Sequence, residues 1–211
     1  MKGNSGNCLR WTWRATLTLA LALAAGCVQA PPAGSLSRPP FEGPLDRVMD
    51  ADHFDPALLA RAIFAESNRV RVENGAFALR SLPALDAAAA RQASYLGLVL
   101  RAEHGNPFPH ALTATDRVEL EGLSPARVGE NALMMPATGT DAAPRSDFTY
   151  ATYAAFLVDA WMKSPGHRAN LLDRDFTYTG CAARIANGVI GGKRLVFAVQ
   201  VFFIPEKLEY Q

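Results

Sequence analysis

Residues 161–172 read WMKSPGHRANLL, and the interpretation of the whole chain starts from this stretch. Ser164 is placed to cap a helix that begins at Pro165, because serine is a favoured capping residue and proline is tolerated at the first helical position. His167 then lies in the first turn of that helix. A helix N-terminus lowers the pKa of an imidazole and keeps the ring neutral. A neutral imidazole binds a metal ion or accepts a proton, so His167 is a candidate site residue.

Apolar residues recur at helical spacing in several segments before this stretch. The first begins at Asp55-Pro56 and stops at Asn74-Gly75, which carry the capping and terminating signals of a helix. Further helices are predicted over about residues 84–103, 114–121 and 150–163.

The last part of the chain has the composition of β-strands. Strands are predicted over about residues 178–185 and 194–203, joined by a turn at Gly191-Gly192. The second strand is apolar on both faces, which indicates a sheet covered on both sides. Helices first and strands last predict an α+β fold, a three-layer α-β-α sandwich.

Two other residues are candidates for a site with His167. His104 continues the apolar stripe of Leu96 and Leu100, so we expect it at the end of the 84–103 helix, and His110 on the following loop is its competitor. Glu130 stands in the tripeptide Gly129-Glu130-Asn131. No Gly-x-Ser-x-Gly and no His-Glu-x-x-His motif occurs, so the sequence contains neither of these signatures of hydrolases.

Taken together and in order, these elements resemble the CAP superfamily in its bacterial, SCP-like form. This superfamily comprises the cysteine-rich secretory proteins, antigen 5 and the plant pathogenesis-related proteins. The resemblance covers about residues 56–204 and is carried by the 161–168 segment, Asn170, Gly129-Glu130-Asn131, Glu66-Ser67-Asn68-Arg69 with Gly75, and the closing strand at 197–203.

The resemblance implies a mainly antiparallel central sheet and a cleft lined by two histidines and acidic residues. Carried over by position, the histidines are His104 and His167, and the carboxylate is Glu130. Two neutral imidazoles and a carboxylate suit Zn²⁺ or another divalent cation, and in the family a glutamate orients a histidine or a water. Arg117 and Arg168 either pair with nearby carboxylates or lie on the surface.

The chain departs from the family pattern in two respects. Many eukaryotic members carry a second glutamate three residues after the tryptophan, where this chain has Ser164. The loss weakens any acid–base mechanism that needs two carboxylates. Those members also contain disulfides. Here Cys181 is left without a partner once the N-terminal signal is removed and Cys27 is lipidated, so it is expected to be buried.

The N-terminus is predicted to be a lipoprotein signal peptide over residues 1–26. Lys2, Arg10 and Arg14 precede an apolar run at 15–25 that is too short to span a bilayer. The run ends in Leu-Ala-Ala-Gly-Cys, which resembles a lipobox and makes Cys27 the acylated N-terminus and membrane anchor. The alternative is ordinary signal cleavage after Ala30, which would leave a secreted protein.

Residues 27–50 are predicted to be a flexible, Pro-rich tether, and residues 51–211 the CAP domain. The chain has 21 basic and 20 acidic side chains, a balance that argues against a nucleic-acid partner. Together with the signal peptide and the lipobox at Cys27, this domain order predicts a cell-envelope lipoprotein.

The first interpretation is a non-enzymatic module that binds a metal, a lipid, sterol-like or peptidoglycan-derived ligand, or both. The alternatives are a metal-assisted hydrolase acting on an envelope or extracellular substrate and a structural protein with a vestigial cleft. The sequence leaves open whether the protein is an enzyme, because three convergent polar groups define a site and not a reaction.

Overall fold

Strand β6 (Lys193–Pro205) is an inner strand of a four-stranded sheet in the computed structural model, which describes residues 43–140, 143–144 and 147–206. It pairs antiparallel with β5 (Tyr178–Ile190) on one side and with β2 (Pro125–Pro136) on the other. The short β1 (Arg80–Ser81) pairs parallel with β5, which gives the order β1-β5-β6-β2. The predicted α+β fold with a mainly antiparallel sheet is confirmed.

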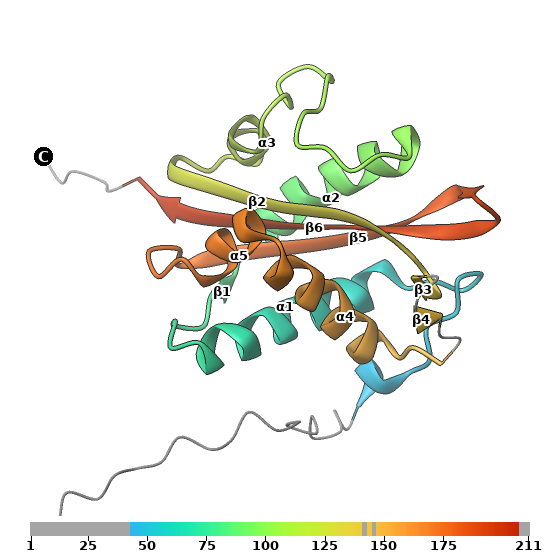
Figure 1. Ribbon diagram of the computed structural model, residues 1–211. Coiled ribbons are helices and arrows are strands. Elements are labelled where there is room, and N and C mark those ends of the chain that lie inside the picture. The colour runs from blue at the N-terminus through green and yellow to red at the C-terminus, as the bar shows by residue number, and fades with distance from the viewer. Residues whose placement is uncertain (1–42, 141–142, 145–146, 207–211) are drawn as a thin grey trace, which may run out of the picture. The chain divides into compact units, whose positions relative to one another are not determined.

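The two faces of β6 belong to two separate hydrophobic layers. Val196, Ala198 and Phe202 pack with α1 (Pro56–Glu73), α4 (Tyr150–Lys163) and α5 (Pro165–Leu172). The alternate residues of β6 pack with α2 (Pro83–Val99) and α3 (Ala114–Leu120). Figure 1 shows the sheet between these two sets of helices, so the three-layer sandwich expected from the two-sided apolar strand is present.

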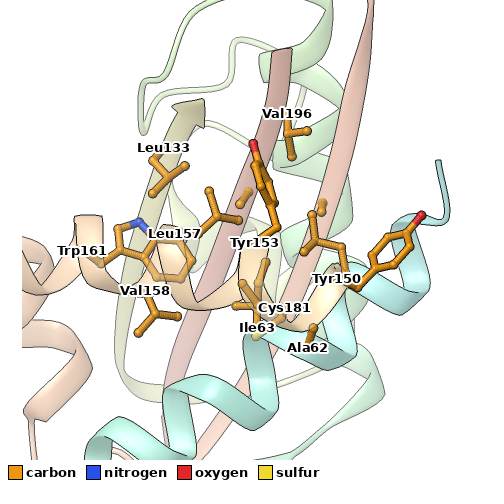
Figure 2. Packing of buried hydrophobic residues seen from close by; sticks show 14 of the residues in the cluster. Ala62, Ile63, Leu133, Tyr150, Tyr153, Leu157, Val158, Trp161, Cys181 and Val196 are labelled. Atoms are coloured by element: carbon orange, nitrogen blue, oxygen red, sulfur yellow. The ribbon is translucent and has the colours of Figure 1, made fainter. Parts of the chain in front are cut away.

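The larger layer is built around the aromatic residues of α4. Trp161 and Tyr153 are fully buried and lie with Leu157 and Val158 between the sheet and α1 (Figure 2). Cys181 of β5 is also buried here, as predicted, and is a free thiol. Burial in this apolar layer raises its pKa far above that of an exposed thiol, so it behaves as a small core residue.

A side-chain cap and a proline explain two helix boundaries that the sequence predicts well. The Asp55 side chain accepts a hydrogen bond from the Leu58 amide at 2.9 Å, directly before α1. Between α4 and α5, Ser164 adopts an extended conformation and its side chain makes no capping hydrogen bond. Pro165 restricts the residue before it to such a conformation, so the proline, more than the serine, separates the two helices.

The structure differs from the sequence-based expectation in α2 and β2. The second helix ends at Val99, four residues earlier than predicted, because Leu100 adopts the left-handed conformation with φ 55°. Strand β2 was not expected, and it carries Glu130. A small hairpin of β3 (Gly139–Thr140) and β4 (Ala143–Pro144) follows it, and the 3-10 turn η1 (Pro44–Asp46) precedes α1.

The predicted signal peptide, the lipidation site Cys27 and most of the tether lie outside the described residues. The last residues of the predicted tether contact the domain: Val48 forms a β-bridge with Thr149, and the Met49 amide donates to the Phe148 carbonyl at 2.7 Å. Within the described ranges, no helix is both long and apolar enough to cross a membrane.

Candidate functional site

Three elements far apart in the sequence bring His104, Glu130 and His167 together. His104 lies on the loop between α2 and α3, Glu130 on β2, and His167 in the first turn of α5. The Nδ1 atom of His104 lies 2.9 Å from Oε1 of Glu130, and because a carboxylate only accepts, Nδ1 carries the proton. The ring centroids of His104 and His167 are 6.3 Å apart. We call these three residues the histidine site.

Glu130 is the buried member of the site, with 3% of its side chain exposed. Its Oε2 atom accepts a hydrogen bond from Nη2 of Arg117 at 2.5 Å, and the Arg117 side chain is fully buried. Both carboxylate oxygens of Glu130 therefore have partners. A buried ion pair of this kind is costly to break, since loss of either charge leaves the other without compensation.

Arg117 also shapes the loop that carries His104. Its Nη1 atom donates to the Ala111 carbonyl at 2.8 Å, and both of its terminal nitrogens lie 3.4 Å from the carbonyl of His104. From α2, Gln92 donates to the Glu103 carbonyl at 2.9 Å. The loop is thus fixed on both sides of His104 by buried side chains, although the His104 side chain itself is 60% exposed.

A second set of hydrogen bonds fixes His167 relative to β2. Asn131 is fully buried and donates to the His167 carbonyl at 3.0 Å. Asn170 donates to the Glu130 carbonyl at 3.2 Å and to Oδ1 of Asn131 at 3.1 Å. These two asparagines connect the start of α5 to the backbone of β2, so they position the histidine site without belonging to it.

The two histidines have opposite electrostatic environments. The carboxylate of Glu130 raises the pKa of His104 above its ordinary value, against a smaller effect of burial. Burial lowers the pKa of His167, and proximity to His104 lowers it further. Near neutral pH, His167 is therefore the more readily neutral of the two, as its place at a helix N-terminus also favours.

The replacement Glu130→Gln is expected to bring the pKa of His104 down, because a neutral amide no longer favours the imidazolium. Titration of the histidine ring protons by NMR measures this directly. His53, whose pKa is raised by Asp50, is the internal control and should not change. The His104–Glu130 pair adds to the free energy of unfolding. This contribution is complete below the unfolded-state histidine pKa of about 6.5, and it is lost as pH rises through the raised folded-state pKa of His104. An unchanged His104 titration in the variant would contradict this geometry.

The family model described as the cysteine-rich secretory protein family, CAP, matches residues 64–202, which include the whole histidine site. The chain belongs to the CAP family. No curated protein matches the sequence.

Two solved bacterial structures resemble this CAP domain. One is an extracellular protein containing an SCP domain from Bacillus anthracis str. Ames, with 22% identity, a TM-score of 0.52, 70% of this chain and 41% of that chain covered. The other is an outer surface protein from Borrelia burgdorferi, with 18% identity, a TM-score of 0.52, 70% of this chain and 93% of that chain covered. At these identities the likeness shows the fold alone, and this chain spans less than half of the Bacillus protein.

Within this CAP domain, the structure brings His104 rather than His110 to Glu130. His110 lies on the same loop, with φ 58°. The apolar spacing predicted that His104 lies at the end of a helix. This prediction is wrong, because α2 has already ended at Val99. Arg117 pairs with the site carboxylate, whereas Arg168 is exposed.

The positioning roles of Asn131 and Asn170 were not predicted. Both residues stand in the motifs that carry the family resemblance, one beside Glu130 and the other three positions after His167. A buried asparagine needs partners for its amide group. Their proximity to site residues in the sequence was the available signal, but the partners come from elements that only the fold brings together.

In the histidine site, the two histidines are better placed to hold a metal ion than all three side chains together, because both carboxylate oxygens of Glu130 already have partners. Within the described part of the chain, no three His, Cys, Asp or Glu side chains are gathered as ligands of one ion. Zn–N bonds of about 2.0–2.1 Å place the centroids of two rings that share an ion about 5–6 Å apart, close to the separation observed. Metal-binding histidines commonly donate their other ring N–H to a carboxylate, as His104 does to Glu130.

Proposed function

We propose that this protein is an exported, cell-envelope CAP-domain module that binds a divalent cation, Zn²⁺ in the first instance, through His104 and His167. The observation that carries the proposal is the His104–Glu130–Arg117 chain of hydrogen bonds. It sets the tautomer of His104, leaves Nε2 of that ring for an ion, and holds the carboxylate behind the histidine. The two similar structures are those of an extracellular protein and an outer surface protein, which supports the proposed location.

The same hydrogen bonds favour binding over catalysis. A general base needs a free carboxylate or imidazole within reach of the substrate. Glu130 is buried and shared between His104 and Arg117, and Ser164 stands where a second glutamate occurs in many relatives. An ion bound here would supply Lewis acidity and open coordination positions for oxygen atoms of a ligand. We propose a lipid, sterol-like or peptidoglycan-derived ligand for those positions.

A metal-assisted hydrolase is the second candidate, and the lowered pKa of His167 is the observation that favours it. A neutral imidazole near pH 7 is able to hold a metal ion, and an ion bound there would lower the pKa of a bound water molecule and so activate it. This candidate requires product formation from an envelope or extracellular substrate, abolished in His167→Ala without loss of stability.

Thermal unfolding of the full chain with increasing Zn²⁺ tests the binding proposal. The unfolding temperature should rise with ligand excess as linkage requires, and the rise should disappear in His167→Ala. His110→Ala is the matched control and should respond as the unaltered chain does, because His110 is not part of the histidine site. An increase in unfolding temperature that persists in His167→Ala would place the ion at another site. An unfolding temperature that Zn²⁺ leaves unchanged in both proteins would refute metal binding.

We also propose that Cys27 is acylated after removal of residues 1–26 and anchors the domain to a membrane. Two acyl chains bind a bilayer firmly, which a short tether of Pro, Gly and Ser does not. The full chain should fractionate with membranes, and Cys27→Ser should move it to the soluble or secreted fraction. The variant Cys181→Ser is the control for the cysteine itself. Unchanged membrane association in Cys27→Ser would refute the anchor.

A further inference from the structure

The outer edge of β5 has no neighbouring strand over most of its length within the described residues. Strand β1 pairs only with Tyr178 and Thr179. The chain then leaves the sheet, because Pro83 begins α2. From Cys181 to Ile185, β5 is paired with β6 on one side only.

The backbone groups on this edge follow the alternation of an antiparallel strand. The Thr179 carbonyl accepts from the Leu82 amide at 3.3 Å, and the Cys181 amide donates to Oδ1 of Asp86 at 2.8 Å. Both groups point away from β6. Because alternate residues face the same side, the N–H and C=O groups of Ala183 and Ile185 also point outward. No hydrogen-bond partner for these groups occurs in the described part of the chain.

A groove follows this edge between α1 and α2. It consists of two adjoining hollows of about 420 and 370 Å³ that share Pro56, Ala90 and Ala183. Its walls carry small side chains, such as Ala60 of α1 and Ser94 of α2, next to the larger Phe54, Arg61 and Phe64. The groove therefore lies where a longer β1 would lie, and none of the three residues of the histidine site lines it.

Charged side chains stand at both ends of the groove. Asp86 lies beside Cys181, where the groove begins, and burial raises the pKa of this carboxyl group; Arg61 of α1 lines the same hollow. Arg184 lines the other end, where its side chain packs along Gly97 of α2. Five residues from Cys181 to Ile185 span about 13 Å at about 3.3 Å per residue, so the groove matches a short extended peptide.

We propose that this groove binds a short extended peptide with free termini, which adds to β5 as a strand. The peptide runs parallel to β5, as β1 does, with its ammonium end toward Asp86 and its carboxylate end toward Arg184. Main-chain hydrogen bonds to the outward groups of Ala183 and Ile185 supply the recognition, as in other cases of strand addition.

Binding of penta-alanine with free termini to the ¹⁵N-labelled full chain, followed by NMR, tests this proposal. Saturable shifts are expected at the amides of Ala183 and Ile185, and hydrogen exchange at these amides should slow by at least tenfold. The resonances of His104 and His167 should stay unchanged, which separates this site from the proposed metal site.

The variant Ala90→Trp fills the groove from an exposed position on α2 and should weaken binding at least tenfold. Ala169→Trp, at an exposed position on α5, is the matched control and should bind as the unaltered chain does. A peptide methylated on alternate amide nitrogens should bind more weakly, because it cannot form the main-chain hydrogen bonds.

Three outcomes would overturn the proposal. They are absence of saturable binding at millimolar peptide, equal binding to Ala90→Trp, and binding that leaves the Ala183 and Ile185 amides unprotected. Occupation of the groove by a fatty acid in place of the peptide, without amide protection, would identify an acyl site and also contradict strand addition.

Discussion

Gly180→Ala is expected to destabilise the protein by about 3 kcal/mol or more, at the upper end of the usual cost of overpacking. A Cβ atom at this position of β5 would approach the carbonyl carbon of Leu85 and the amide nitrogen of Asp86 far more closely than real Cβ atoms come to any neighbour. Both atoms belong to the backbone of α2, which cannot turn aside as a flexible side chain does. The helix must therefore move away from the sheet. Denaturant unfolding followed by circular dichroism measures the loss.

Gly166→Ala is the matched control for this substitution. No atom lies within 4 Å of its added Cβ, and the residue is in the first turn of α5. Alanine there should be neutral or stabilise by up to about 1 kcal/mol, because glycine is a poor helix former. If Gly180→Ala unfolds within about 0.5 kcal/mol of the unaltered chain, the close contact between β5 and α2 is wrong.

Arg117→Met is expected to cost about 3–5 kcal/mol of folding free energy, since it leaves the buried carboxylate of Glu130 without its cation. The size of the effect follows from the burial of both side chains and from the loss of the Arg117 hydrogen bonds to the loop. Urea unfolding at pH 7 measures it. The double variant Arg117→Met with Glu130→Met should recover much of the loss, because neither charge then remains buried and unpaired.

The exposed pair of Arg47 and Asp55 provides the comparison for this experiment. Arg47→Met should cost no more than about 1 kcal/mol, as for other solvent-exposed ion pairs. A similar small cost for Arg117→Met, or a double variant as unstable as the sum of its single changes, would show that Arg117 and Glu130 do not stabilise each other in the fold.

The sequence predicted the parts of the fold that are governed by local signals. The boundary between α4 and α5 follows from Pro165, which separates them, and the start of α1 follows from Asp55-Pro56. The two-sided apolar pattern of β6 predicted the sandwich, because a strand with apolar residues on both faces has to be covered on both.

Strand β2 was missed because its signal is not local. Residues 125–136 read PARVGENALMMP, which has no clean alternation and contains a glycine and two prolines at its ends. The strand forms through pairing with β6, which lies far along the chain and pairs Glu130 with Val201. Glu130 was therefore identified from its motif and the family resemblance, whereas its burial and its contact with Arg117 depended on the tertiary fold.

The environment of His104 could not be predicted for a related reason. The apolar spacing of Leu96 and Leu100 continues to His104, and the first glycine or proline after Leu100 is Gly105, beyond that histidine. The left-handed conformation of Leu100 ends it, and the loop beyond is fixed by Gln92 and Arg117 from other elements. Helix periodicity thus predicted a nearby residue but not the geometry that places its ring against Glu130.

Calorimetric titration of Zn²⁺ into the full chain and the variants His104→Ala, His167→Ala and Glu130→Gln tests the central claim most directly. We expect about one ion per chain and no binding in either histidine variant. Binding should be weakened about 10–100-fold in Glu130→Gln, as expected for a residue that orients a ligand. Absence of saturable binding, or histidine variants that bind as the unaltered chain does, would contradict the site. Complete loss in Glu130→Gln would make the carboxylate a ligand and contradict its proposed role behind His104.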